Sequence, residues 1–344
     1  MYIGIIGHFG GKESFNDGQT VKTMNIYNGL LNSGISTIDK IDTYYIKRNP
    51  IKFLFVFIKS LFRDKKYIVL LSINGRRLLF PILFLLSKCG KDIYHYAIGG
   101  RLANEVEKYP SWKRYVSSFK GNWMESHELE EKLQSLGVEN AIYLPNFKKL
   151  NVLEEKDLDK DYIPPFQFCI FSRVMKEKGV SDAINAVNKI NSKYGKQIVT
   201  LDIYGPVEDD YKEELFSLIE SSQKNCKYCG IIDSSKSVEA LKSYFALLFP
   251  THWKHEGIPG TIIDAFSAGI PVIARKWQYC TEMISNGKNG YYYDFDKPEL
   301  LIDVMEYAIV HANETMEMKR NCLKKAVEYS ENHVMKQIKR EMEI

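Results

Sequence analysis

The residues best suited to chemistry lie between positions 256 and 274, in the sequence EGIPGTIIDAFSAGIPVIA. This pattern predicts a loop containing glycine and proline that enters a helix over residues 261–268. The free backbone N–H groups and the positive dipole end of such a helix favour an anion, for example a diphosphate. The residues expected around that anion are Gly257, Ile258, Pro259, Gly260 and Thr261.

Two carboxylates frame this loop. Glu256 precedes it, and Asp264 lies about one turn into the expected helix. A carboxylate at Asp264 can accept two hydrogen bonds from the diol of a ribose. An ordinary turn, with an acidic residue that complements the helix dipole, has the same pattern. The residues alone therefore leave both interpretations open.

A second charged loop, FSRVMKEKG over residues 171–179, follows an expected strand and precedes an expected helix. Arg173 and Lys178 would place two cations at the end of a sheet. There an arginine can bind a diphosphate through two N–H groups, and a lysine acts as a point charge. Lys176 is the alternative to Lys178 in this loop. Simple solvation of a charged loop is the competing interpretation.

The N-terminal half offers fewer candidates. Gly10 and Gly11 follow the first expected strand, and glycines allow the backbone to approach a ligand closely. This pair is not the GxGxxG pattern of dinucleotide-binding proteins, and a tight turn is the alternative interpretation. His95 lies in the expected strand 92–97, near its end, where a histidine either contacts a ligand or has a structural role.

The elements that must position these residues alternate between strand and helix, which predicts an α/β fold with parallel sheets. One series of strands is expected over 1–7, 67–72, 92–97, 121–126 and 141–144, and a second over 166–171, 198–204, 246–250, 271–274 and 290–293. The charged stretch 148–165, which ends in two prolines, is the expected linker. Two such domains would place a cleft between the carboxyl ends of their strands.

Bulk properties exclude several classes of protein. The 344 residues suffice for two domains, and 45% hydrophobic and 26% charged residues are ordinary for a globular chain. A net charge of +4 is too small to indicate nucleic-acid binding. Six irregularly spaced cysteines favour reduced thiols and no metal site. We expect neither a signal peptide nor a transmembrane helix, because the apolar runs are too short.

Together, the segments 256–274 and 171–179 resemble the donor-binding signature of the retaining GT-B glycosyltransferases of family 4. The resemblance covers nearly the whole chain and is strongest over residues 166–293. It implies the GT-B fold, an α/β architecture in which two Rossmann-like, doubly wound domains face a central cleft. The expected domains are an acceptor-binding domain over 1–160, joined by a C-terminal helix over 330–344, and a nucleotide-sugar donor-binding domain over 161–329.

The resemblance implies roles for the residues of the two signature segments. Glu256 would contact hydroxyls of the transferred sugar. Asp264 would hold the nucleotide ribose, although the family usually has Glu at this position. Arg173 and Lys178 would bind the donor phosphates and stabilise the departing nucleotide.

Four further residues receive roles from the resemblance. His95 would contact the donor sugar near the reacting carbon. The loop with Gly10 and Gly11 would face the donor phosphates and the acceptor, and Glu282 would line the nucleotide pocket.

The implied reaction moves a sugar from a nucleotide-diphosphate sugar, here expected to be a UDP-sugar, to an acceptor hydroxyl with retention at the anomeric carbon. No metal and no cofactor beyond this co-substrate are expected. The acceptor would be a saccharide or lipid-linked saccharide in bacterial capsule, cell-surface polysaccharide or glycolipid synthesis. The alternatives are a non-catalytic nucleotide-sugar-binding subunit or sensor, or an epimerase of the same shape. The missing GxGxxG disfavours a NAD-dependent oxidoreductase.

The stretch KRNPIKFLFVFIKSLFRDKK, over residues 47–66, interleaves basic side chains with phenylalanines. It predicts an interfacial helix that rests on an anionic membrane surface. A core helix with solvated flanks is the alternative. On the first interpretation, we expect a cytoplasmic protein with a peripheral contact at the inner face of the membrane through 47–66.

Overall fold

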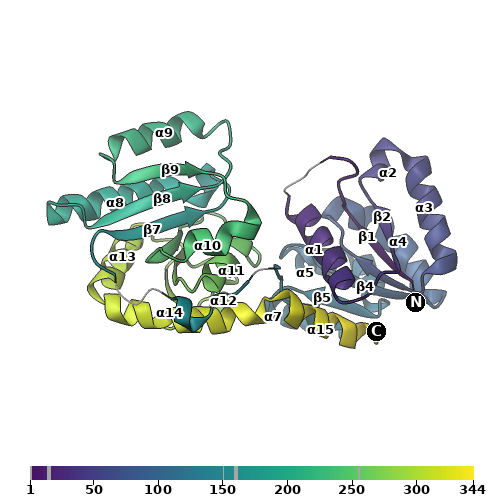
Figure 1. Ribbon diagram of the computed structural model, residues 1–344. Coiled ribbons are helices and arrows are strands. Elements are labelled where there is room, and N and C mark those ends of the chain that lie inside the picture. Colours follow the sequence, from purple (N-terminus) through teal and green to yellow (C-terminus); the bar gives the residue numbers. More distant parts are fainter. Residues whose placement is uncertain (1, 14–16, 150, 159–161, 255) are drawn as a thin grey trace. The chain divides into compact units, whose positions relative to one another are not determined.

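The computed structural model describes residues 2–13, 17–149, 151–158, 162–254 and 256–344. The chain forms two compact units (Figure 1): unit 1 contains Met1–Lys149 and Glu331–Ile344, and unit 2 contains Leu150–Ser330. The division falls after Lys149, whereas the boundary predicted from the sequence fell after residue 160. Apolar residues in the charged stretch explain the difference. The N–H of Leu153 donates to the carbonyl of Ser267 at 2.9 Å, which attaches this stretch to unit 2.

The sheet of unit 1 has six parallel strands in the order β2-β1-β3-β4-β5-β6. The strands are β1 (Ile3–Gly7), β2 (Ile38–Asp42), β3 (Lys66–Val69), β4 (Asp92–Tyr96), β5 (Gly121–Met124) and β6 (Ala141–Tyr143). The sequence did not predict β2, because it is an edge strand in which only Ile41 is buried. Its IDKID sequence therefore lacks a continuous apolar run.

Helices cover both faces of this sheet (Figure 1). They are α1 (Gly18–Asn32), α2 (Tyr45–Arg48), α3 (Pro50–Arg63), α4 (Ile73–Lys88), α5 (Leu102–Lys108), α6 (Pro110–Ser117), α7 (His127–Ser135) and α15 (Glu331–Met342). Alternation along β3 separates the two layers, because Tyr67 packs into one core and Ile68 into the other. The C-terminal helix α15 packs against α1 at Gly29, where a Cβ atom would lie 2.8 Å from the sulfur of Met335.

Unit 2 repeats this architecture with a parallel sheet in the order β12-β11-β10-β7-β8-β9. Its strands are β7 (Phe166–Phe171), β8 (Val199–Tyr204), β9 (Cys226–Gly230), β10 (Ala246–Phe249), β11 (Val272–Arg275) and β12 (Gly290–Tyr293). Its helices are η1 (Glu155–Asp157), η2 (Lys176–Lys178), α8 (Val180–Tyr194), α9 (Lys212–Ser221), η3 (Ser234–Lys236), α10 (Ser237–Leu241), α11 (Gly260–Ser267), α12 (Cys280–Met283), α13 (Leu300–Val310) and α14 (Ala312–Glu328). The predicted doubly wound α/β fold is confirmed, whereas the short edge strand β9 was missed.

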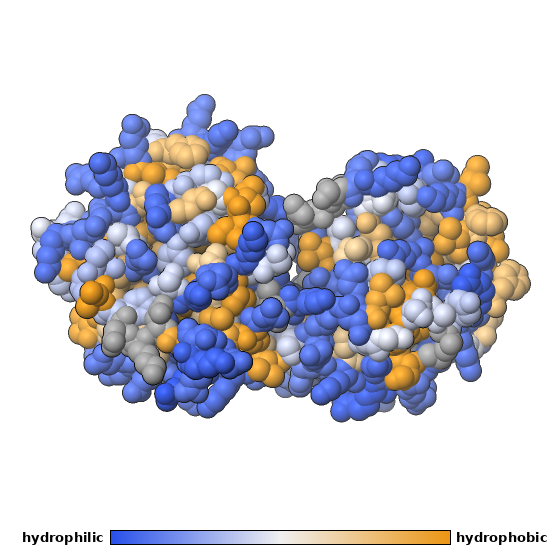
Figure 2. Space-filling view, in the orientation of Figure 1, coloured by the Kyte–Doolittle hydropathy of each residue, from blue (hydrophilic) through white to orange (hydrophobic). Residues whose placement is uncertain are grey.

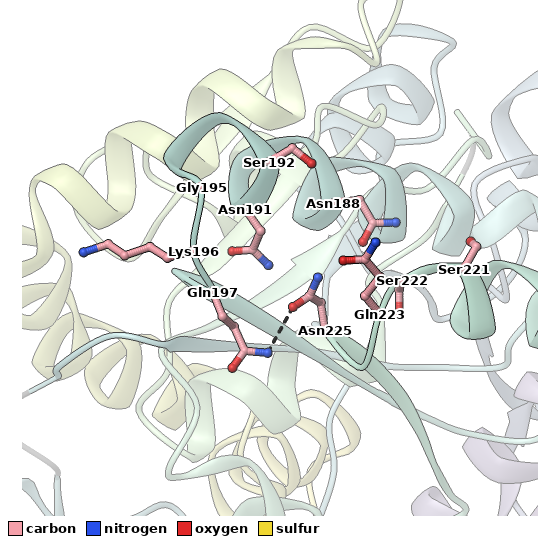
Figure 3. A pocket seen from close by; sticks show the side chains of 10 residues that line it. All are labelled: Asn188, Asn191, Ser192, Gly195, Lys196, Gln197, Ser221, Ser222, Gln223 and Asn225. Carbon is pink, nitrogen blue, oxygen red and sulfur yellow. Dashed lines mark hydrogen bonds between the residues drawn. The ribbon is translucent and has the colours of Figure 1, made fainter.

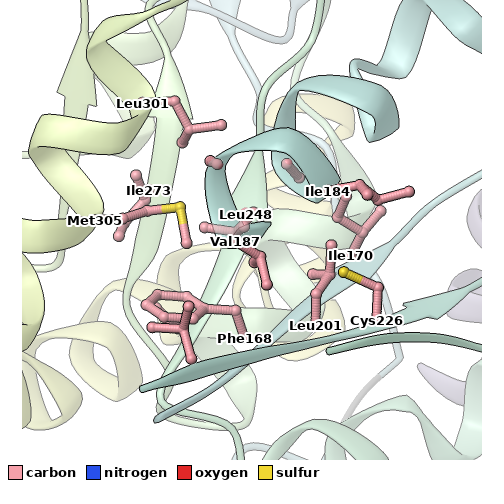
Figure 4. Packing of buried hydrophobic residues seen from close by; sticks show 14 of the residues in the cluster. Phe168, Ile170, Ile184, Val187, Leu201, Cys226, Leu248, Ile273, Leu301 and Met305 are labelled. Carbon is pink, nitrogen blue, oxygen red and sulfur yellow. The ribbon is translucent and has the colours of Figure 1, made fainter. Parts of the chain in front are cut away.

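Figure 4 shows one of the two cores that flank the sheet of unit 2. Phe168 of β7 packs there with Val187 of α8 and Met305 of α13. The next residue, Cys169, belongs to the opposite core together with Ile263 of α11. Burial of each large apolar side chain stabilises such a core by roughly 1.5–3 kcal/mol. The two cores hold the strands rigidly and so fix the positions of the loops at the strand ends.

Candidate functional site

The candidate site lies where β7 and β10, neighbours in the sheet of unit 2, reach their carboxyl ends. The strand order reverses between these two strands, since β8 lies beside β7 and β11 lies beside β10. Ligands of open α/β sheets bind at the carboxyl end of such a switch point. The two segments that the sequence singled out, 171–179 and 256–264, both follow these strands.

Two glycines allow the loops after β7, β8 and β10 to pack closely. Gly179 has a φ of +69°, and a Cβ atom there would lie 2.0 Å from the carbonyl oxygen of Pro250. Gly205 has a φ of +132°, and its Cβ would lie 1.8 Å from the carbonyl oxygen of Ser172. Neither position has room for a side chain, and glycine adopts these φ values without strain. The loop after β7 is therefore held between its two neighbours.

Lys178 and Glu256 form an ion pair across the switch point, between Nζ and Oε1. The hydroxyl of the buried Thr251 donates to the same Oε1 at 3.0 Å. The lysine and glutamate side chains are 20% and 15% exposed, so the pair is partly shielded yet reachable by a ligand. Two predicted site residues thus neutralise each other here.

Arg173 lies on the same loop but has another partner. Its Nη1 is 3.4 Å from Oε1 of Glu208, in the loop after β8. The two side chains are 52% and 37% exposed, so water screens the contact and it adds little stability. An anionic ligand can therefore replace Glu208 without leaving a buried charge unpaired.

Helix α11 begins at Gly260, one residue earlier than the sequence predicted. Pro259 stands at its N-cap position and offers no side-chain cap. Within the described part of the chain, the N–H groups of Gly260 and Thr261 donate no hydrogen bond, which suits them to an anion. The loop before the helix is anchored, because Nε1 of Trp277 donates to the carbonyl of Gly257 at 3.1 Å.

Asp264 faces the protein interior. Its side chain is 1% exposed, and one oxygen accepts a hydrogen bond of 2.8 Å from the hydroxyl of Ser237 on α10. Asp264 therefore joins α11 to α10 in this structure, and its contact with a ribose stays a prediction. No sequence pattern indicated Ser237, which comes from a separate helix.

Ile258 and Glu282 border the same loop. Ile258 is 5% exposed and packs in the core beside α11, so it anchors the loop. Glu282 lies on the short helix α12, which follows β11, and its side chain is half-buried. The N–H of Gln278, just before α12, donates to the carbonyl of Lys254 at 3.0 Å. This bond places α12 beside the segment that leads to Glu256.

The N-terminal glycine loop, in unit 1, already contacts a carboxylate. Gly10 and Gly11 have φ values of +85° and +62°. Asp42, at the end of β2, accepts hydrogen bonds of 2.9 Å from the N–H of Phe9 and from the N–H of Gly11. The N–H of Gly11 thus has a partner in this structure, and the contact of this loop with a donor phosphate stays a prediction. The sequence missed this contact because it missed β2.

His95 lies in the core of unit 1. It is fully buried in unit 1, and its ring packs edge-on against Phe80 with centroids 5.1 Å apart. Burial, with Arg76 nearby, holds the pKa of His95 well below its usual value, so the ring is neutral. Alternation along β4 turns this side chain into the core, and its contact with a donor sugar stays a prediction.

Sequence reasoning missed three residues that shape the site: Thr251, Glu208 and Trp277. Thr251 and Glu208 each follow the carboxyl end of a strand. A polar residue that follows a buried strand was therefore the sequence pattern from which both could have been predicted. Trp277 is 1% exposed, as is typical of a core residue.

No group of three or more His, Cys, Asp or Glu side chains in the described ranges is arranged to hold a metal ion.

A family of known proteins matches most of unit 2. Residues 154–326, just over half of the chain, match the family described as glycosyl transferases group 1. A protein of Klebsiella pneumoniae, named as an uncharacterized 41.2 kDa protein in the cps region, is 28% identical over 182 residues. That match covers 51% of this chain and 45% of the Klebsiella protein, so the two align over about half of their lengths.

Solved structures share the fold. The crystal structure of Anabaena Alr3699/HepE in complex with UDP has a TM-score of 0.74 and 13% identity, and the match covers 100% of both chains. The lipopolysaccharide outer core galactosyltransferase WaaB, in its apo form, has a TM-score of 0.64 and 16% identity over 99% of both chains. At these identities the likeness shows the fold alone, which is the predicted GT-B fold.

The close approach of the loops can be tested with one substitution. Gly179→Ala adds a methyl group against the Pro250 carbonyl in a left-handed conformation, whereas Gly195→Ala, at a φ of +63°, adds it in open space. We expect Gly195→Ala to lower the free energy of unfolding by about 1 kcal/mol, and Gly179→Ala by roughly 2 kcal/mol more. Urea denaturation measures both, and equal losses would contradict the packing described.

Proposed function

The chain belongs to the glycosyl transferases group 1 family, and we propose that it is a retaining glycosyltransferase that uses a UDP-sugar. The acceptor is a hydroxyl of a saccharide or lipid-linked saccharide, and the product belongs to a bacterial capsule or other cell-surface polysaccharide. The observation that carries the proposal is the ion pair of Lys178 with Glu256 beside the uncapped start of α11. That arrangement offers a diphosphate a cation and free N–H groups together.

Relatives support the choice of donor and product. Anabaena HepE, which shares the fold, was solved in complex with UDP and with UDP-glucose. The Klebsiella relative is named for its place in the cps region, which supports a role in polysaccharide synthesis. WaaB, another structural neighbour, is named as a lipopolysaccharide galactosyltransferase, which supports a saccharide acceptor.

In the proposed reaction, the bond between the anomeric carbon and the diphosphate oxygen breaks as the acceptor oxygen bonds to the same face of that carbon. The acceptor proton passes to the departing phosphate. Arg173 and Lys178 stabilise the negative charge that develops on the diphosphate, as an oxyanion hole does. Because two side-chain cations provide this charge, we propose that no divalent metal is needed.

Glu256 has two successive partners in this proposal. Without a donor it neutralises Lys178. When the diphosphate takes over Lys178, the carboxylate becomes free to accept hydrogen bonds from hydroxyls of the transferred sugar. Thr251, which donates to Glu256 at 3.0 Å, keeps the carboxylate in place during this exchange. The exchange links binding of the diphosphate to positioning of the sugar.

We also propose that unit 1 touches an anionic membrane through α3. Its exposed face carries Ile51, Phe55 and Phe62, which are 81%, 70% and 88% exposed. Phe57 and Ser60 of this helix are buried, and Phe53, Val56 and Leu61 pack against the core, so the face with Ile51, Phe55 and Phe62 is the one left exposed. Figure 2 shows hydrophobic surface along the side of unit 1 where Figure 1 places α3. Within the described ranges, no helix has the length and apolar character to span a bilayer.

Basic side chains lie on α3 and on the neighbouring helix α2. Lys47 and Arg48 lie on α2, and Lys52, Lys59 and Arg63 lie on α3 itself. Each lysine or arginine near an anionic leaflet contributes about 1 kcal/mol to binding. The combination suits a helix that lies in the interface, where a lipid-linked acceptor would also be found.

The phosphate assignment is tested by three alanine variants. We expect Arg173→Ala and Lys178→Ala each to lower transferase kcat/KM by roughly 10²–10³-fold, because each removes charge stabilisation of the leaving group. Lys176→Ala, an exposed neighbour on the same loop, is the control and should retain activity. Nucleotide release from a panel of UDP- and GDP-sugars measures the rates, with and without EDTA. Full activity in both site variants would exclude the assignment.

The membrane contact is tested by sedimentation with vesicles of phosphatidylcholine and phosphatidylglycerol. We expect the wild-type chain to pellet with them and the variant Phe55→Glu with Phe62→Glu to remain in solution, because charge on the apolar face opposes insertion. The control is Phe216→Glu in unit 2, where Phe216 is 42% exposed. Equal partitioning of all three proteins would rule out α3 as the contact.

A further inference from the structure

A polar groove of about 580 Å³ lies at the amino ends of strands β8 and β9 of unit 2 (Figure 3). The candidate site lies at the other, carboxyl ends of the strands. The last turns of α8, the segment 195–197 that leads into β8, the end of α9 and Asn225 before β9 form its walls. Its volume falls within the roughly 300–1,000 Å³ of small-molecule sites. Because it lies at the amino ends of the strands, it is separate from the loops that carry Lys178 and Glu256.

Most of the side chains that line this groove are amides or hydroxyls. Five of its ten residues carry side-chain amides, namely Asn188, Asn191, Gln197, Gln223 and Asn225. Three more are serines, and the other two are Gly195 and Lys196. Among the described residues that line it, none has a carboxylate, an aromatic ring or a purely aliphatic side chain. Amides and hydroxyls both donate and accept, which is what a ligand rich in hydroxyl groups requires.

Some of these groups hold the groove together, and others are left for a ligand. Asn191 accepts from the N–H groups of Ile198 and Val199 at 2.7 and 3.0 Å, which fixes the entry to β8. The side chains of Asn188 and Gln223 make no hydrogen bond within the described part of the chain. Gln197 and Asn225 bond to each other at 3.0 Å, and each retains a further polar atom.

The local backbone makes the groove rigid. Gln223 and Lys224 have φ values of +52° and +69°, which side-chain-bearing residues seldom adopt. The buried Ser222 stabilises this turn, since its hydroxyl donates to Ile219 at 2.6 Å and accepts from the N–H of Cys226 at 3.2 Å. The backbone of Gln223 is therefore held at a fixed place, and its side chain lies near that of Asn188 (Figure 3).

The groove opposes anions and offers a cation no carboxylate among the described residues that line it. Helices α8 and α9 both end at the groove, and helix C-termini carry partial negative charge, which opposes phosphates and carboxylates. Lys196 is the one charged residue among the described residues of the lining, and in Figure 3 its ammonium group points away from the other side chains. A cationic ligand finds no carboxylate, and an apolar ligand finds no apolar side chain. A neutral, hydroxyl-rich ligand remains.

We propose that this groove is a binding site for a neutral oligosaccharide, separate from the donor site. In a chain that extends or modifies a polysaccharide, such a site would hold a stretch of glycan away from the place of transfer. Binding needs neither nucleotide nor catalysis, so the proposal can fail or succeed independently of the proposed function.

The test is a titration of the full chain with maltohexaose, which is α-linked, and cellotetraose, which is β-linked, by ligand-observed NMR without nucleotide. We expect one of them to bind with a Kd on the order of 1 mM. The variant Asn188→Ala with Gln223→Ala should weaken this affinity about tenfold or more, because two hydrogen bonds are lost. Asn185→Ala, an exposed position on the same helix outside the groove, is the matched control and should bind as the wild type does.

Two further measurements separate the groove from the donor site and a neutral ligand from an acidic one. Lys178→Ala should leave the affinity for the oligosaccharide unchanged, because Lys178 lies at the carboxyl ends of the strands and the groove lies at their amino ends. Tighter binding of an acidic tetragalacturonate than of the neutral probes would contradict the assignment of a neutral ligand. Absence of binding by both neutral probes, or equal binding by the groove variant and the Asn185→Ala control, would overturn the proposal.

Discussion

The ion pair of Lys178 with Glu256 joins the two loops on which the candidate donor site depends. The pair connects positions 78 residues apart, and it exists because the sheet places β7 next to β10. Gly179 brings the loop after β7 against Pro250. Thr251, the next residue, then fixes the carboxylate by a hydrogen bond. The topology, one glycine and one threonine thus determine where both charges lie.

In the proposed function, this pairing would make the site favour a diphosphate over weaker anions. Lys178 is balanced by the partly shielded Glu256, so a ligand must replace that carboxylate to gain the cation. A singly charged anion gains little by such an exchange, whereas a diphosphate brings more charge and can also accept from the N–H groups at the start of α11. The carboxylate released from Lys178 stays close by, where a sugar attached to the diphosphate would lie.

Much of the fold and of the candidate site could be predicted from the sequence. The features that were missed share a physical origin, since they depend on tertiary packing and not on a local sequence pattern. The buried strands and the loop before α11 have strong local patterns, so the α/β fold and the pairing of segments 171–179 and 256–264 could be predicted. The edge strand β2 has no such pattern, and with it the contact of Asp42 with Gly11 was missed. For His95, the sequence indicates a place near the end of β4, whereas its burial depends on the face of β4 that it occupies. Ser237 and Glu208 reach their partners only through tertiary packing.

The central claim is that Glu256 holds Lys178 until a diphosphate replaces it. Calorimetric titration of UDP into the Glu256→Gln variant tests this most directly. The variant keeps an acceptor for Thr251 but releases Lys178, so we predict UDP binding roughly tenfold tighter than in the wild type, together with reduced sugar transfer. Glu177→Gln, an exposed position on the loop after β7, should leave UDP affinity unchanged. Unchanged or weaker UDP binding by Glu256→Gln would contradict this role of Glu256.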